Sequence, residues 1–238
     1  MSSNLPPLRA LSLDFAGTLA IERHSRAAIY ALAAHNAGMD VEEDIMVEAM
    51  GRAWLSLPLE IQGAFRATDS WFRHFIRQVF VDDLGMDPAR LGAVQEELFA
   101  AFSDATNFQV FPGAKKLLDV AANSGLRVVI VSNWTPRLPD LMRKLDLIQG
   151  VDAIVTSSSE QVEKPNPELF RRAMSRVGVG PAATLHVGDH LTNDVTGAQA
   201  AGIEAIWIDR EGTLTPPADV FRLTSLEDVV AVVRNLCL

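Results

Sequence analysis

The chain has little cysteine, no excess of positive charge and no long apolar run, and each absence excludes a class of protein. Its 238 residues include one cysteine, Cys237, so no disulfide can form within the chain, which is typical of a reducing compartment. The formal net charge of −9 argues against nucleic acid as a partner, because a phosphate backbone needs a basic surface. No apolar run approaches the roughly 20 residues that cross a bilayer. The first residues also lack the charged-then-apolar order of a secretory signal. We therefore expect a cytoplasmic protein that binds neither nucleic acid nor membranes but can still bind a small anionic molecule.

What is present is a change of hydrophobic pattern along the chain. Residues 9–14 have the pattern of a short buried strand that ends in an acid, whereas residues 20–108 carry apolar residues at helical spacing. After Pro112, short branched apolar segments alternate with helical ones. Strands are predicted at 127–132, 152–157, 184–189 and 203–209. Helices are predicted at 24–37, 42–55, 69–81 and 89–102, and then at 112–123, 137–146, 167–177, 192–201 and 225–236.

This order predicts an α/β fold: a Rossmann-like, doubly wound parallel sheet core with an inserted all-α helical cap domain. We expect the core to comprise residues 1–19 and 109–238 and the cap residues 20–108. Asn166 and Pro167 have the sequence of a helix start, and Thr224 with Glu227 has the spacing of a capping box. In open parallel sheets, ligands bind beyond the carboxyl ends of the strands, so the chemistry is expected there.

Four clusters of polar residues follow the predicted strands or precede a predicted helix. They contain Asp14 to Thr18, Ser132 with Asn133, Lys164, and Asp189 with Asn193 and Asp194. Anions at adjacent strand ends repel one another unless a cation lies between them, which predicts a hard metal such as Mg²⁺. We therefore expect Asp14 and Asp189 to share one pocket that faces Lys164. His186, inside an apolar strand, is predicted to be a core histidine with satisfied hydrogen bonds.

In this order the four clusters resemble the four motifs of the haloacid dehalogenase-like hydrolases, over residues 9–19 and 110–209. The resemblance implies that Asp14 is a nucleophile that forms a covalent intermediate. It implies that Ser132 and Lys164 take part in catalysis by holding and neutralising the transferred group. The metal ligands that it implies for Mg²⁺ are Asp14, the backbone carbonyl of Ala16, Asp189 and Asp194.

Substrate-binding roles are expected for two residues of the core clusters, Thr18 and Asn133, and for His24, Arg52 and Arg66 in the insertion. Arg52 and Arg66, together with Trp54 and Trp71, are candidates to line a pocket for an anionic or aromatic group. The alternative is that they form the surface of the insertion or its packing. Residues 52–70 contain Pro58 and Gly63, which predicts a loop between helices.

Ala16 departs from the pattern of the phosphatases in this family, which usually carry a second aspartate two residues after the nucleophile. That aspartate protonates the leaving oxygen, and loss of such a group typically costs about 10²–10⁴ in rate. The phosphonoacetaldehyde hydrolases of the family also have alanine there, but they need a cap lysine, and residues 1–114 contain no lysine. The L-2-haloacid dehalogenases lack the Gly-Asp pair that this chain keeps at Gly188 and Asp189.

Three interpretations of Ala16 remain open from the sequence. The enzyme can act on phosphates whose leaving group needs little protonation, it can take the proton from elsewhere, such as His24 or His74, or it can be a weakly active or non-catalytic binding relative. We favour a Mg²⁺-dependent phosphatase that acts on a small, activated phosphorylated metabolite, as a monomer or homodimer. A dehalogenase or a C–P bond hydrolase is the alternative.

Overall fold

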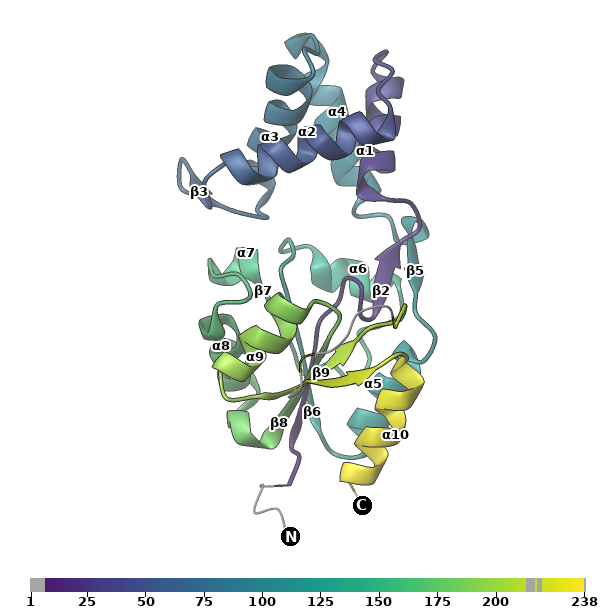
Figure 1. The fold of residues 1–238 in the computed structure, drawn as a ribbon, viewed down its shortest axis with the longest axis vertical. Coiled ribbons are helices and arrows are strands. Elements are labelled where there is room, and N and C mark those ends of the chain that lie inside the picture. Colours follow the sequence, from purple (N-terminus) through teal and green to yellow (C-terminus); the bar gives the residue numbers. More distant parts are fainter. Residues whose placement is uncertain (1–6, 213–216, 218–219, 238) are drawn as a thin grey trace. The chain divides into compact units, whose positions relative to one another are not determined.

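The computed structural model describes residues 7–212, 217 and 220–237. The chain folds into two compact units, residues 1–21 with 110–238 and residues 22–109. Two short strands carry the chain out of the first unit and back into it, β2 (Ala20–Glu22) and β5 (Phe108–Val110), and they form a two-stranded sheet of their own (Figure 1).

The first unit is built on a six-stranded sheet in the order β10-β9-β8-β1-β6-β7, in which every described pairing is parallel. Its strands are β1 (Ala10–Leu13), β6 (Arg127–Ser132), β7 (Ala153–Thr156), β8 (Thr184–Gly188), β9 (Glu204–Ile208) and β10 (Phe221–Leu223). The chain adds β6 and β7 on one side of β1 and then β8, β9 and β10 on the other. The order of the sheet therefore reverses beside β1, which is where ligands bind in such folds.

Helices cover both faces of this sheet, as expected for a parallel sheet whose strands are apolar on both sides (Figure 1). α5 (Ala114–Asn123) and α10 (Leu226–Leu236) lie on one face, and α8 (Pro167–Val177) and α9 (Gly197–Ala200) lie on the other. The shorter helices of this unit are α6 (Leu138–Lys144), α7 (Ser157–Glu160), a 3₁₀ turn, η4 (Pro181–Ala183), and a π-helical turn, η5 (Leu191–Thr196). Another 3₁₀ turn, η3 (Ala105–Asn107), belongs to the second unit. The predicted Rossmann-like α/β core is confirmed.

Local capping agrees with the sequence at one helix and differs at another. The Asn166 side chain accepts a hydrogen bond from the backbone N–H of Glu168 and begins α8, as predicted. The start of α10 is displaced by one residue from the predicted pair: Ser225, not Thr224, accepts the hydrogen bond, from the N–H of Asp228. Both pairs have the same spacing, and the spacing alone did not distinguish them.

The second unit is mainly helical. It contains α1 (Arg26–Asn36), α2 (Glu43–Ser56), α3 (Asp69–Arg77), which continues as a π-helical segment η1 (Gln78–Asp83), a 3₁₀ turn η2 (Pro88–Arg90) and α4 (Leu91–Ala101). The prediction that residues 52–70 form a loop is corrected in two ways. α2 extends through Ser56, and a short antiparallel hairpin follows, made of β3 (Glu60–Ile61) and β4 (Ala64–Phe65). The unit is therefore not entirely α.

Aromatic side chains fill the core of the second unit. Tyr30 stacks on Phe80, and Trp71 stacks on Phe75, with ring centroids 5.9 Å and 5.6 Å apart. Trp71 is buried and its indole N–H donates to the carbonyl of Pro58, so it belongs to this core and not to an open pocket. In the described part of the chain, no helix has the length and apolar character needed to span a membrane.

Candidate active site

Asp14 directly follows the central strand β1, at the carboxyl edge of the sheet. Its backbone N–H donates to the carbonyl of Val187 on β8, which extends the strand pairing to this residue. The side chain is buried, and one carboxylate oxygen, Oδ1, accepts a hydrogen bond of 2.7 Å from Nζ of Lys164. Strand pairing therefore fixes the backbone of Asp14, and the Lys164 ammonium holds its carboxylate.

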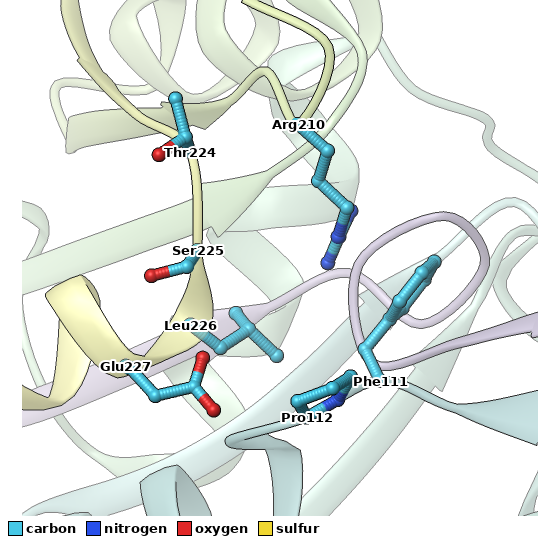
Figure 2. Close-up of a pocket in the computed structure, with 7 residues that line it drawn as sticks. All are labelled: Phe111, Pro112, Arg210, Thr224, Ser225, Leu226 and Glu227. Carbon is cyan, nitrogen blue, oxygen red and sulfur yellow. The ribbon is translucent and has the colours of Figure 1, made fainter.

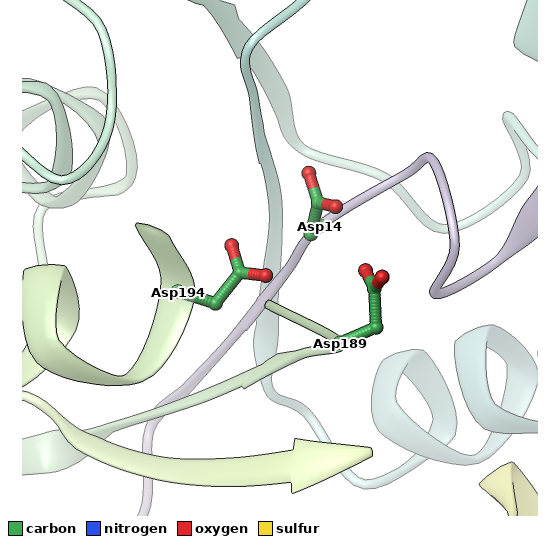
Figure 3. Close-up of side chains that lie close together, drawn as sticks. All are labelled: Asp14, Asp189 and Asp194. Carbon is green, nitrogen blue, oxygen red and sulfur yellow. The ribbon is translucent and has the colours of Figure 1, made fainter. Parts of the chain in front are cut away.

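Two further carboxylates lie beside it. Asp189 follows β8 and Asp194 lies in η5, and one carboxylate oxygen from each of the three acids lies within 4.8 Å of the others (Figure 3). This confirms that parallel pairing brings Asp14 and Asp189 together, although 175 residues separate them in the sequence (189 − 14). Figure 3 shows the three carboxylates lying close together, each carried by a different segment of the chain.

Lys164 joins two of these acids. Its Nζ donates to Asp14 Oδ1 at 2.7 Å and to Asp194 Oδ1 at 2.5 Å, and the whole side chain is buried. Burial by itself lowers the pKa of the Lys164 ammonium, but the charges of Asp14 and Asp194 outweigh it and hold that pKa above its ordinary value. Lys164 therefore stays charged in the site at neutral pH.

One ammonium group does not compensate three carboxylates, and the pKa values of the acids reflect this. Burial and the charges of Asp14 and Asp194 raise the pKa of Asp189 to about 7. Burial, reinforced by the charge of Asp194, also raises the pKa of Asp14 despite its bond to Lys164. Burial opposes ionisation of Asp194 as well, but Lys164 and His186 lower its pKa below the ordinary range. The cluster carries excess negative charge that a cation would relieve.

The residues present fit such a cation. Carboxylate oxygens are the ligands that hard divalent ions prefer. The backbone also approaches the acids at two glycines, where a Cβ atom would overlap them: Gly17 (φ +79°) against the Asp189 carboxylate, and Gly188 against Asp194. Ala16, whose carbonyl was predicted to be a ligand, forms an isolated parallel bridge with Ala20. The three acids could therefore hold a metal ion.

Two residues predicted to bind substrate, Thr18 and Asn133, form hydrogen bonds with protein groups of the site. The Thr18 hydroxyl is fully buried and donates to Asp189 Oδ1 at 3.0 Å. The Asn133 side chain binds the backbone of Lys164 at both ends, accepting from its N–H at 2.8 Å and donating to its carbonyl at 3.0 Å. These contacts fix Thr18 against Asp189 and Asn133 against Lys164, and the predicted roles of both residues toward a substrate stay predictions. Ser132, at the end of β6, hydrogen-bonds to the Asp14 side chain.

The three predicted residues of the insertion lie in the second unit. His24 is exposed before α1, and the exposed Arg52 side chain lies 3.6 Å from Glu48 and 3.9 Å from Asp83. The Arg66 guanidinium lies over the rings of Trp54 and Trp71, at 4.5 Å and 5.4 Å from their centroids. Their roles toward a substrate stay predictions.

Arg210, after β9, is a residue of this region that the sequence pattern did not indicate. Its guanidinium donates to the carbonyls of Gly17 and Thr18, in the loop that follows Asp14, and lies 3.6 Å from the ring centroid of Phe111. A cavity of about 200 Å³ beside it is lined also by Pro112 and by residues 224–227 (Figure 2). Arg210 therefore ties the loop after Asp14 to the carboxyl end of β9.

Comparison with known proteins assigns this arrangement to a family. The family model described as haloacid dehalogenase-like hydrolase matches residues 8–202, most of the chain. The chain belongs to the haloacid dehalogenase-like hydrolases. It is therefore a hydrolytic enzyme, and the resemblance seen in its four motifs is confirmed.

Other haloacid dehalogenase-like proteins resemble this chain over much of its length. The haloacid dehalogenase-like hydrolase domain-containing protein 3 of Danio rerio is 30% identical over 238 aligned residues, which cover 96% of this chain and 98% of that protein. The protein of the same name from Bos taurus is 29% identical, covering 88% and 85%. A phosphoserine phosphatase from Thermus thermophilus is 31% identical, over 60% of this chain and 58% of that one.

Solved structures of this family share the fold. A phosphatase of the family from Thermococcus onnurineus matches with a TM-score of 0.69 at 22% identity, covering 94% of this chain and 97% of that one. A 2-haloacid dehalogenase from Pseudomonas syringae matches with a TM-score of 0.70 at 21% identity, covering 96% and 99%. Phosphatases and a dehalogenase thus share this architecture, so the reaction has to be argued from the site.

Proposed function

We propose that this hydrolase is a Mg²⁺-dependent phosphatase that acts on a small phosphorylated metabolite with an activated leaving group. The observation that carries the proposal is the meeting of Asp14, Asp189 and Asp194, with oxygens within 4.8 Å of one another. The ammonium of Lys164 pairs with two of them, Asp14 and Asp194. When bound by these acids, Mg²⁺ would supply positive charge between the carboxylates and the phosphoryl oxygens of the substrate. A dehalogenase that expels halide would not need such a cluster.

In the proposed reaction, a carboxylate oxygen of Asp14 attacks the phosphorus atom. A bond forms between that oxygen and phosphorus, the bond from phosphorus to the leaving oxygen breaks, and the leaving group departs with the electron pair. Lys164 holds the attacking carboxylate in place and neutralises charge that accumulates on the transferred group. Water then attacks the phosphorus of the aspartyl phosphate, which releases inorganic phosphate and restores the Asp14 carboxylate.

Ala16 restricts the leaving group. Position 16 has no group that can donate a proton to the departing oxygen. An alkoxide leaves poorly without such a donor, whereas a phenolate or a carboxylate is stable enough to leave as an anion. The proposed substrates are therefore aryl or acyl phosphates. The phosphatase relatives are named for alkyl phosphates, phosphoserine and glyceraldehyde 3-phosphate, so their names support a phosphatase but not this restriction, which rests on Ala16 alone.

The second unit supports a further part of the proposal. We propose that residues 20–108 act as the cap that selects the substrate, with His24, Arg52 and Arg66 as candidate contacts.

The single cysteine, Cys237, which is exposed, is consistent with a cytoplasmic enzyme.

A substrate panel tests the proposed reaction. With Mg²⁺ present, p-nitrophenyl phosphate and acetyl phosphate are expected to be hydrolysed, glycerol phosphate about 10²–10⁴ times more slowly, and none of them in EDTA. Release of p-nitrophenolate and of inorganic phosphate measures these rates. Similar alkyl and aryl rates would mean that another group supplies the proton. Chloride release from 2-chloropropionate that persists in EDTA would replace the proposal with a dehalogenase.

A pair of glycine substitutions tests whether the close approach at the acids matters. Gly17 and Gly178 both have positive φ, so Gly17→Ala and Gly178→Ala are each expected to lower the free energy of unfolding by about 1–2 kcal/mol. Only at Gly17 would the new methyl group overlap the Asp189 carboxylate, whereas nothing lies within 4 Å of one at Gly178. Gly17→Ala is therefore expected to lower hydrolysis on the order of 10²-fold, since a misplacement of about 1 Å has that effect.

Urea denaturation and p-nitrophenyl phosphate turnover measure the two effects separately. Gly178→Ala, at the end of α8, is the matched control and should retain the parent rate. Equal rates for the two variants would show that the approach of residue 17 to Asp189 does not contribute to the site.

A further inference from the structure

His186 is a buried polar side chain that the proposed reaction does not use. It lies in the interior of β8, directly opposite Ser12 on β1, and is 0% exposed. Its Nδ1 lies 2.9 Å from the hydroxyl of Ser12, and its ring packs edge-on against Phe170 at 5.0 Å between centroids. His186 is thus a core histidine, as predicted, but its hydrogen bonds are not all satisfied, because Nε2 has no hydrogen-bond partner among the described residues.

Nε2 nevertheless faces a specific group. It lies 3.5 Å from Oδ1 of Asp194, a distance that is long for a hydrogen bond but short for an electrostatic contact in a buried site. A nitrogen lone pair directed at a carboxylate oxygen would be repelled, whereas an N–H group there is attracted. The proton is therefore on Nε2, and the Ser12 hydroxyl then donates to the lone pair of Nδ1.

Asp194 is held from three sides by these contacts. Its Oδ2 accepts from the backbone N–H of His190 at 2.9 Å, its Oδ1 accepts from Lys164 at 2.5 Å, and His186 faces the same Oδ1. Lys164 in turn binds Asp14 at 2.7 Å. Polar groups thus run in one line from Ser12 in the middle of the sheet to the proposed nucleophile at its edge.

We propose that Ser12 and His186 are a positioning pair that orients Asp194 toward a bound divalent cation and toward Lys164. The inference rests on the proposed function, because it takes Asp194 as a ligand of Mg²⁺. Groups that contact a ligating side chain from behind typically contribute about 10–100-fold to metal affinity. Burying a hydroxyl and an imidazole inside an apolar sheet costs desolvation free energy. The contact between this pair and the Asp194 carboxylate gives a functional reason for that cost.

Three substitutions, two at His186 and one at Ser12, separate positioning from packing. The amide nitrogen of glutamine reaches about the place of Nε2, whereas that of asparagine reaches only about the place of Nδ1. His186→Gln is therefore expected to retain the Mg²⁺ affinity of the parent within about 3-fold, and His186→Asn and Ser12→Ala to weaken it by about 10–100-fold. Phe170→Leu is the matched control, because it loosens the same part of the core without changing a polar contact.

Titration calorimetry with Mg²⁺ alone measures the affinity of each purified protein, and thermal unfolding measures its stability. In His186→Asn and Ser12→Ala, turnover of p-nitrophenyl phosphate should show a lower kcat than in the parent, with little change in KM. Phe170→Leu is expected to unfold at a lower temperature with unchanged Mg²⁺ affinity. If Mg²⁺ affinity instead follows the unfolding temperature through the whole series, His186 acts only in packing and the positioning pair is refuted.

The ¹H–¹⁵N spectrum of the imidazole provides an independent reading in the parent protein. A proton on Nε2 of His186 is expected, and a proton found on Nδ1 alone would overturn the inference whether or not Mg²⁺ binds. A parent protein that shows the Nε2 proton but binds no Mg²⁺ would support the orientation of His186 toward Asp194 and overturn the proposed function instead.

Discussion

Asp14→Asn is expected to lower the Mg²⁺-dependent hydrolysis of p-nitrophenyl phosphate by at least about 10⁴-fold, since removal of a covalent nucleophile has effects of this size. The amide is nearly isosteric with the carboxylate but cannot attack phosphorus. Initial rates of p-nitrophenolate release measure the effect. In the parent protein, mass spectrometry of acid-quenched samples should also find a phosphoryl group on the peptide that contains Asp14.

Asp119→Asn is the matched control for this change. Asp119 is an exposed residue of α5, so the same chemical substitution there should leave both turnover and the unfolding temperature unchanged. A rate for Asp14→Asn within about tenfold of the parent would eliminate the aspartyl phosphate and with it the proposed mechanism.

Ala16→Asp is expected to raise the hydrolysis of alkyl phosphates such as glycerol phosphate by about 10²–10⁴-fold, with a much smaller effect on aryl phosphates. The reason is that a carboxylic acid at this position would protonate the departing alkoxide, whereas a phenolate needs no proton. The ratio of kcat/KM for the alkyl substrate to that for p-nitrophenyl phosphate is the measurement, because it cancels differences in the active fraction of each preparation.

Ala16→Asn controls for size and polarity, since it adds a side chain of the same shape that cannot transfer a proton at neutral pH. The alkyl rate should not rise in this variant. If Ala16→Asp leaves the substrate ratio at the parent value, the proton of the leaving group comes from another residue, and the restriction to activated phosphates has to be abandoned.

Some elements of the fold were predictable because their patterns are local. The strand at 127–132 has the bounds that its branched apolar run predicts, because a strand buried on both faces needs such residues at every position. β10, an edge strand of three residues whose Phe221 is exposed, has no such run, and the two-residue strands of the β3–β4 hairpin are too short to show a period. These were not predicted.

The same distinction holds for the hydrogen-bond partners in the site. Thr18 donates to Asp189 across 171 residues of sequence, and Ser12 meets His186 across 174. No spacing within a single motif encodes such a contact, because it depends on the register between β1 and β8. For that reason the contacts of Thr18, His186 and Arg210 with other parts of the chain were not predicted.

The sequence by itself determined the α/β core, the family and the acids that gather at the sheet edge, because strand periodicity and the geometry of parallel sheets place strand-end residues together. Only the tertiary structure decided which side chains of the site are hydrogen-bond or ion-pair partners. Lys164 lies between Asp14 and Asp194, Asn133 holds the backbone of Lys164, and Arg210 holds the loop after Asp14. The physical reason is that hydrogen bonds form over about 3 Å and require a fixed relative placement of segments that packing alone provides.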